Sequence, residues 1–174
     1  MSDPITIGVA AGERIKAAAD DIIAEVRQMP AALVTWVPGE GVWSVMDNLC
    51  HVREFVPFWT GEVLRIVRTP DALWGRDHTD SARVAAVTGT AAYELNAVLN
   101  AVREAANASA VTLASMSDAD LATEAPSKNP RWGVKPGSFV VDHLLVQHIE
   151  KHLGQIRRNV AQYRAQSGNS ASHS

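Results

Sequence analysis

Apolar residues recur at intervals of three and four along four segments of the chain, which is the spacing of one face of an α-helix. The first segment covers residues 12–29 and ends at Pro30, which cannot continue a helix. The second covers residues 45–68, the third 91–116 and the fourth 138–164. Four amphipathic segments of about 18–27 residues predict an all-α protein folded as a four-helix bundle.

The second segment has a marked beginning and an interruption. Ser44 is placed to cap its first turn, and Asp47 follows three residues later, so the pair resembles a capping box with Asp in place of Glu or Gln. Pro57 lies in the middle of the segment, where proline removes a backbone hydrogen bond and clashes with the preceding turn. The pattern therefore predicts a kink at Pro57 or a helix made of two parts.

The connections between the segments differ in character. Residues 69–88 show little periodicity and form a long connection for a bundle, which allows a crossover rather than a hairpin between the second and third helices. Residues 117–137 contain three prolines and two glycines and predict a loop with one short turn at most. No alternating stretch predicts a strand. The third helix is rich in alanine, so another helix can approach it closely.

Composition is that of an ordinary globular protein. The 174 residues, 47% hydrophobic and 20% charged, suit one domain, which we expect at residues 1–166, with a disordered polar tail at 167–174. A formal net charge of -3 without a basic patch argues against a nucleic-acid partner. The sequence shows neither a signal peptide nor a run of ~20 apolar residues, so we expect a cytoplasmic protein that does not span a membrane. The single cysteine excludes an internal disulfide.

Candidate chemistry begins in the stretch VQHIEKHLGQI, residues 146–156 of the fourth helix. His148 and His152 are four residues apart, so their side chains point about 40° apart on successive turns, and two such imidazoles can bind one metal ion. The glutamate of the helical HExxH zinc motif is absent, because Ile149 follows His148. Two interpretations stay open: half of a metal site, or two core histidines hydrogen-bonded to polar neighbours.

A third ligand has to come from another helix. In an α-helix His143 points about 140° away from His148 and about 180° away from His152, so we predict that it faces outward. His51 borders the apolar stripe of the second helix and fits better. Three neutral imidazoles from two helices leave coordination positions open, as catalytic zinc sites do. The alternative is that His51 packs in a hydrophobic cluster with neighbouring phenylalanines.

Other polar residues allow ordinary interpretations as well. Asp47 and Glu54 each lie about one turn from His51, so either carboxylate is a candidate to orient the imidazole, although we favour an exposed surface position for Glu54. Cys50 points about 100° away from His51 and suits a small buried residue rather than a nucleophile. His78 suits a solvated polar loop. The five tryptophans lie mostly in or near loops, where we expect them to pack beneath the chain.

Two stretches of the sequence resemble the DinB-like family. PGEGVWSVMDNLCHV, residues 38–52, resembles the family's Trp-Ser helix start with a histidine several residues on, and DHLLVQHIEKHLGQIRR, residues 142–158, resembles its closing H-x-x-x-H helix. The resemblance implies an up-down-down-up four-helix bundle, with one histidine of the second helix and two of the fourth binding a divalent metal ion. Carried over to this sequence, the ligands are His51, His148 and His152.

The resemblance also implies a function. Characterised relatives include transferases and isomerases that use low-molecular-weight bacterial thiols such as mycothiol or bacillithiol. We therefore expect a metal-dependent thiol S-transferase that acts on a small-molecule substrate, with Zn²⁺ or Ni²⁺ as the ion because imidazole suits both. Family members often dimerise, which implies a homodimer. The alternatives are a metal-dependent hydrolase and a non-catalytic metal-binding stress-response module.

Overall fold

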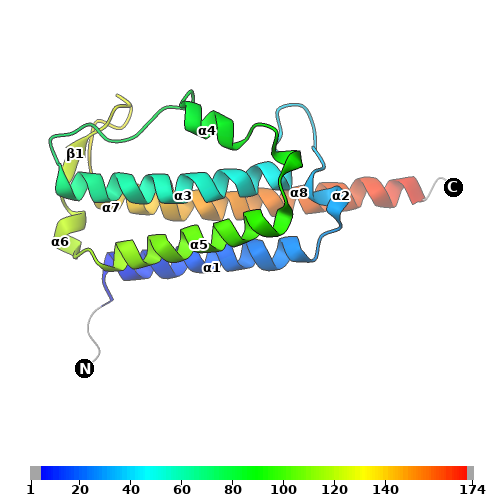
Figure 1. The fold of residues 1–174 in the computed structure, drawn as a ribbon, viewed down its shortest axis with the longest axis horizontal. Helices are drawn as coiled ribbons and strands as arrows, with labels where there is room; N and C mark the ends of the chain where they lie inside the picture. Colours follow the sequence, from blue (N-terminus) through cyan, green and yellow to red (C-terminus); the bar gives the residue numbers. More distant parts are fainter. Residues whose placement is uncertain (1–4, 172–174) are drawn as a thin grey trace.

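Four long helices pack lengthwise around one core (Figure 1). The computed structural model describes residues 5–171, and the long helices are α1 (Ile7–Arg27), α3 (Val45–Arg68), α5 (Leu95–Ala114) and α8 (Gln147–Ala171). Helices α1 and α8 run in one direction, and α3 and α5 run in the other (Figure 1). The predicted four-helix bundle and its up-down-down-up order are therefore confirmed.

A long crossover joins the parallel helices α3 and α5. Between them the chain returns along the length of the bundle and forms the short helices α4 (Ser81–Ala86) and η1 (Thr90–Ala92) (Figure 1). An antiparallel hairpin needs only a short loop, whereas neighbouring helices that point the same way need a returning segment. The aperiodic stretch at residues 69–88 lies in this crossover, which packs α4 against α3.

Smaller elements complete the two ends of the bundle. They are α2 (Ala31–Val34), α6 (Asp118–Leu121), β1 (Glu124–Pro126) and β2 (Val134–Pro136). The two strands form an antiparallel ribbon, so the prediction that this segment contains no strand is wrong. Trp74 of the crossover holds the ribbon in place: its indole N–H donates to the carbonyl of Ala125 at 2.8 Å, and its backbone N–H donates to the carbonyl of Pro126 at 3.0 Å.

Helix α3 begins where the sequence predicts and passes through its proline. The Oγ of Ser44 accepts from the backbone N–H of Asp47 at 3.1 Å, and the Asp47 carboxylate accepts from the backbone N–H of Ser44 at 2.9 Å, which confirms the capping box. Pro57 lies inside one continuous helix on its exposed side, which excludes the two-part helix, while the alternative of a kink at Pro57 stays a prediction. On that side water can replace the N–H donor that proline lacks.

The fourth long helix begins in a wider helical form. The short α7 (Gly137–Phe139) leads into η2 (Val140–Val146), which is a π-helix. At its end the backbone N–H of Gln147 donates to the carbonyl of Asp142, five residues earlier, instead of the four of an α-helix. The α-helix predicted from residue 138 is therefore interrupted over residues 140–146 and resumes at Gln147.

Helix α8 extends beyond the rest of the bundle (Figure 1). It continues to Ala171, past the predicted end at residue 164 and into the segment 167–174 that the sequence assigns to a disordered tail. Residues 172–174 of that tail lie outside the described part of the chain. The domain boundary at residue 166 stays a prediction.

The core is one cluster of buried apolar side chains from all four long helices. Helices α1 and α5 approach most closely where glycine faces their partner: a Cβ on Gly8 would lie 2.1 Å from the carbonyl oxygen of Leu113, and one on Gly12 would lie 2.9 Å from the Cα of Ala110. The alanine-rich third helix therefore has the close neighbour that its composition allows.

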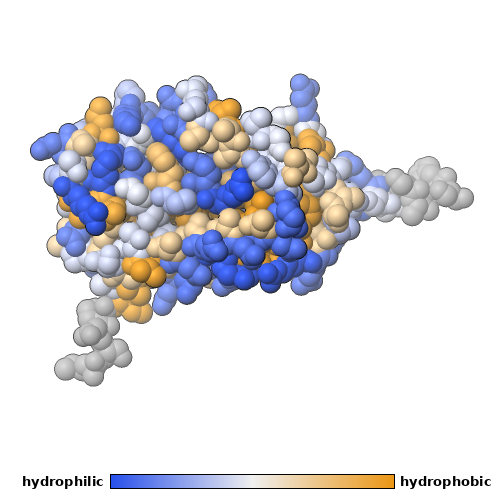
Figure 2. Space-filling view, viewed as in Figure 1, coloured by the Kyte–Doolittle hydropathy of each residue, from blue (hydrophilic) through white to orange (hydrophobic). Residues whose placement is uncertain are grey.

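The surface carries its apolar residues in scattered positions. On the face shown in Figure 2 they alternate with polar residues over the bundle rather than forming a single broad patch. Among the described residues, no helix has both the length and the apolar character that crossing a membrane requires.

Gly8→Ala tests the close contact between α1 and α5. We expect it to lower the free energy of unfolding by roughly 1–3 kcal/mol, because the added methyl group overlaps a backbone carbonyl that cannot move independently. Gly61→Ala is the matched control, since a Cβ there meets nothing within 4 Å and lies on the exposed side of α3. It should raise stability by up to about 1 kcal/mol through helix propensity. Urea unfolding of both variants measures the difference, and equal values would contradict the close approach.

Candidate metal centre

Three histidines from two helices converge in the bundle. His51 is on α3, and His148 and His152 are on successive turns of α8. Each histidine contributes one ring nitrogen as a candidate metal ligand, and these three nitrogens all lie within 4.8 Å of one another. His51 and His152 are 3% and 5% exposed, and His148 is half-buried, so His148 is the member nearest to solvent. The structure thus brings together the three residues that the resemblance selects.

Burial keeps the three imidazoles neutral. Loss of hydration is the main cause that lowers the pKa of His51 to about 2, of His148 to about 4 and of His152 to about 3. The positive charges of Arg76 and Arg83 lower the pKa of His51 further. A neutral imidazole has a free lone pair on one nitrogen, which is the form that binds a metal ion.

Asn48 fixes the ring orientation of His152. The Nδ1 of His152 lies 2.7 Å from the Oδ1 of Asn48, and the Nδ2 of Asn48 donates to the carbonyl of Ser44 at 2.8 Å. Because the amide nitrogen is committed to that carbonyl, the amide oxygen accepts from the imidazole, which places the His152 proton on Nδ1. The lone pair of Nε2 is then free to bind a metal ion. Histidine ligands in known metal sites are held in the same way, by donating their other ring N–H to a neighbouring acceptor.

Two nitrogens of the group have no hydrogen-bond partner. The Nδ1 atoms of His51 and His148 are buried without a partner at hydrogen-bond geometry among the described residues, although the Leu144 backbone is near enough to raise the pKa of His148 against the larger effect of burial. An unpaired buried polar atom costs roughly 1–3 kcal/mol, and native structures contain few of them. The donor set therefore fits a divalent ion. Two nitrogens that share a tetrahedral zinc lie about 3.4 Å apart, so any pair near the 4.8 Å limit has to close inward to bind.

Aromatic rings enclose the histidines. Trp43, in the loop before α3, stacks on His152 with ring centres 5.9 Å apart and meets His51 edge-on at 5.0 Å. Phe55, one turn after His51, stacks on His148 at 4.0 Å. These apolar walls remove water from the imidazoles, which is the desolvation that lowers their pKa values.

The two carboxylates beside His51 serve other groups. Asp47 accepts hydrogen bonds from the capping serine and from the hydroxyl of Thr90, so it joins the start of α3 to the crossover and does not orient His51. Glu54 forms a bidentate ion pair with Arg76, whose Nη1 and Nη2 donate to the two carboxylate oxygens at 2.5 and 2.7 Å. The prediction of an ordinary surface position for Glu54 is wrong, since its side chain is 18% exposed, with one oxygen 3.9 Å from the Nδ1 of His51.

The remaining candidates lie outside the group. His143 is exposed on η2 and stacks on Phe139 at 5.2 Å, which confirms that it faces away from the ligand set, although the π-helix replaces the α-helix assumed for its angle. Cys50 is fully buried, and burial raises the pKa of its thiol, as expected for a small core residue. His78 is exposed in the crossover, as predicted.

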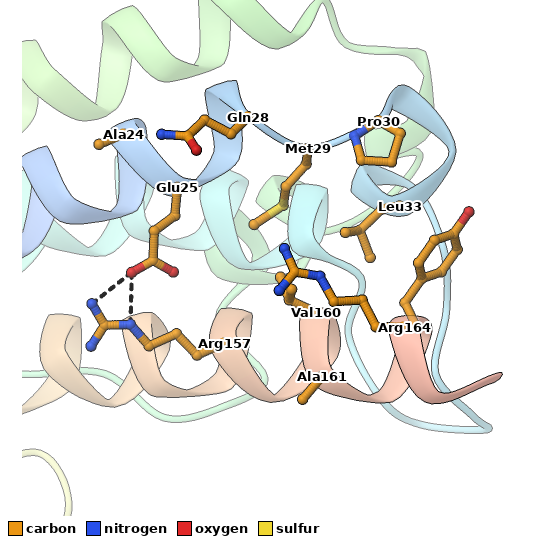
Figure 3. Close-up of a pocket in the computed structure, with 11 residues that line it drawn as sticks. Ala24, Glu25, Gln28, Met29, Pro30, Leu33, Arg157, Val160, Ala161 and Arg164 are labelled. Carbon is orange, nitrogen blue, oxygen red and sulfur yellow. Dashed lines mark hydrogen bonds and ion pairs between the residues drawn. The ribbon is translucent and has the colours of Figure 1, made fainter. Parts of the chain in front are cut away.

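A separate pocket of about 500 Å³ lies where α8 passes the ends of α1 and α2 (Figure 3). Arg157 crosses it and donates to Glu25 at 2.7 Å. None of the three histidines lines this pocket, so it is distinct from the histidine group.

The sequence pattern does not indicate two residues that shape the group. Asn48 lies in the apolar stripe one turn before His51, and a polar residue on a buried face is the signal that could have identified it. Trp43 is predicted to pack beneath its loop, whereas it packs on the histidines. Asn159 of α8 holds it there by donating to the Trp43 carbonyl at 2.8 Å.

Comparisons with known proteins agree with this architecture. The sequence model of the DinB superfamily matches residues 14–156, a span that includes all three histidines. Among solved structures, the chain is similar to YfiT from Bacillus subtilis, described as a probable metal-dependent hydrolase with an unusual four-helix bundle topology. The TM-score is 0.75 and the sequence identity 9%, covering 90% of this chain and 87% of that one, so the likeness shows the fold alone. No curated protein matches the sequence.

Asn48→Ala tests whether the Asn48 amide orients His152. We expect the affinity for Zn²⁺ to fall roughly 10–100-fold, because the imidazole loses the acceptor that fixes its tautomer and ring position. Competition with a chromophoric chelator measures the affinity, and thermal unfolding without metal checks that the variant folds. Asn100→Ala, an exposed asparagine on α5, is the matched control and should bind like the wild type. Unchanged affinity in Asn48→Ala would exclude the orienting role.

The lowered pKa values predict how the metal-free protein responds to acid. A histidine in the unfolded chain has a pKa of about 6.5. At a pH below about 6.5 but above the lowered pKa values of the folded protein, the histidines are protonated in the unfolded state and neutral in the folded state. Stability should therefore fall as the pH decreases from 7 to 5, by up to about 1.4 kcal/mol per pH unit and histidine. A variant with His51, His148 and His152 all replaced by Gln should lose less. Urea unfolding with a chelator present compares the slopes, and equal slopes would contradict the lowered pKa values.

Proposed function

Because the chain belongs to the DinB superfamily and carries three neutral histidines that could share one metal ion, we propose that it is a divalent-metal-dependent thiol S-transferase with His51, His148 and His152 as the ligands. One observation carries the proposal: the group comprises three imidazoles from two helices, with no fourth side chain among the described residues. A set of three protein ligands leaves positions for ligands from outside, which is typical of catalytic rather than structural zinc sites.

The reaction would join a low-molecular-weight thiol to an electrophilic substrate. Zinc or nickel, both suited to imidazole ligands, would favour the thiolate form of a coordinating thiol. The sulfur supplies the electron pair of the new carbon–sulfur bond, and the leaving group X departs with the pair of the broken bond. With the thiol proton released, R–SH and R′–X give R–S–R′ and HX.

The chain's own residues prepare this site by covering the imidazoles and by keeping carboxylates out of the ligand set. Trp43 and Phe55 cover the imidazoles, and Asn48 holds His152 in one tautomer. Glu54, the nearest carboxylate to His51, is occupied by Arg76. The donor set is therefore neutral, and an anionic ligand such as a thiolate would supply the balancing negative charge.

A metal-dependent hydrolase is the second candidate. It is favoured by the description of YfiT as a probable metal-dependent hydrolase, and positions open to a thiol are also open to water. A non-catalytic metal-binding module is the third, and would bind the ion without turnover. The small-molecule partner, the homodimer and the cytoplasmic location stay predictions.

Metal loading tests the ligand set. We expect metal-free protein incubated with Zn²⁺ or Ni²⁺ to retain about one ion per chain after dialysis, as elemental analysis would measure. His51→Ala and His148→Ala should each lose most of this binding, because two imidazoles remain. His78→Ala is the matched control, since this exposed histidine lies outside the group. Full retention in the first two variants would eliminate the proposed ligands.

Thiol conjugation tests the reaction class. The metal-loaded protein should accelerate conjugation of at least one bacterial thiol to a generic electrophile, measured as loss of free thiol. His148→Ala should return the rate to background, whereas His78→Ala should not change it. No acceleration with any thiol would remove the transferase proposal, and cleavage of ester or amide substrates without thiol would favour the hydrolase.

A further inference from the structure

We propose that Arg83 of α4 binds an anionic group, a carboxylate or a phosphate, of the small molecule that enters the open side of the histidine group. The inference deepens the proposed function and rests on its central premise, that a ligand from outside completes the group. It names a specificity-determining residue and the chemical class of ligand that this residue selects.

Arg83 lies next to Trp43, the residue whose ring packs on the histidines. Its guanidinium carbon is 6.0 Å from the centre of the indole ring, and the same indole stacks on His152 and meets His51 edge-on. This places a cation against the aromatic residue that covers His51 and His152, outside the ligand set itself.

Arg83 has no anionic partner in the described part of the chain. Its side chain is half-buried, and the guanidinium makes one hydrogen bond, from Nη1 to the carbonyl of His78 at 3.0 Å. The nearest carboxylate along the helix, Asp80, accepts from the backbone N–H of Arg83 and directs its ion pair to Arg76. A guanidinium has five N–H donors. Most donors of Arg83 are therefore available to a ligand.

The neighbouring Arg76 shows the contrasting case. Its side chain is 7% exposed and forms ion pairs with Glu54 at 2.5 Å and Asp80 at 3.1 Å, while its guanidinium lies 3.7 Å from the ring centre of Phe58. These contacts fasten the crossover to α3, so Arg76 serves the fold. They also hold α4, which buries none of its own side chains, in the position that sets Arg83 against Trp43.

The charges of the site favour a ligand with two negative groups. An imidazole that binds a metal ion is neutral, so three of them would leave the two positive charges of a divalent ion uncompensated, and the ion pair of Glu54 with Arg76 is neutral in sum. Arg83 adds one positive charge. A thiolate at the ion together with a carboxylate or phosphate on the guanidinium would offset most of this charge, and the planar guanidinium binds either oxyanion through two parallel hydrogen bonds.

A matched pair of probes tests the proposal by calorimetric titration of the zinc-loaded protein. The pair is 3-mercaptopropionate and its methyl ester, which share the thiol and differ in the negative charge. The wild type should bind the acid roughly tenfold more tightly, as one charge-assisted hydrogen-bonded pair provides. Arg83→Gln should remove the preference and leave binding of the ester unchanged. Arg68→Gln is the control, because this exposed arginine lies about 25 Å along α3 from His51.

A second pair separates this inference from the proposed function. Succinic monohydroxamate and its methyl ester bind metal ions through the hydroxamate and carry no thiol. If neither thiol binds but the wild type prefers the anionic hydroxamate and Arg83→Gln does not, the thiol proposal fails and the role of Arg83 stands. If both pairs bind without any preference for the anion, if the preference survives in Arg83→Gln, or if no probe binds, the inference is overturned.

Discussion

The burial of three uncharged imidazoles between α3 and α8 is the constraint on which the rest of the site depends. Histidines removed from water give up their protons, and the three neutral rings bring ring nitrogens within 4.8 Å of one another, two of which lack a hydrogen-bond partner among the described residues. The surrounding residues reinforce this state: Trp43 and Phe55 exclude water, and Asn48 satisfies one ring nitrogen. The structure holds a cluster of three imidazole donors whose arrangement suits one metal ion.

The topology of the bundle supplies the second half of the site. Because α3 and α5 run parallel, the chain has to return along the bundle, and the returning segment packs against the helix that carries His51. Arg76 and Thr90 fasten that segment to Glu54 and Asp47 of α3. A connection that topology requires is thereby placed beside the histidines, where its side chains can take part in recognition.

Most of the fold and the histidine set can be predicted from periodicity and resemblance, and the rest depends on contacts between distant parts of the chain. Spacing alone places His148 and His152 on one helix face, and the family resemblance adds His51. The orienting role of Asn48 depends on a contact with a residue 104 positions away, which no local pattern encodes. The ribbon of β1 and β2 likewise depends on Trp74, about fifty residues earlier in the chain. The π-helix leaves the apolar spacing almost unchanged, so the sequence predicts an ordinary helix there.

That π-helix affects how the continuous helical segment from α7 to α8 packs against the crossover at one end and against α3 at the other. Its wider turn uses more residues per revolution than an α-helix, so η2 changes the angular phase between α7 before it and α8 after it. In α7, Phe139 faces Trp74 of the crossover at 6.4 Å, while in α8, His148 and His152 face α3. An unbroken α-helix would impose one fixed phase on both ends. The π-helix gives the two ends a different relative phase, in which Phe139 packs toward the crossover while His148 and His152 face α3.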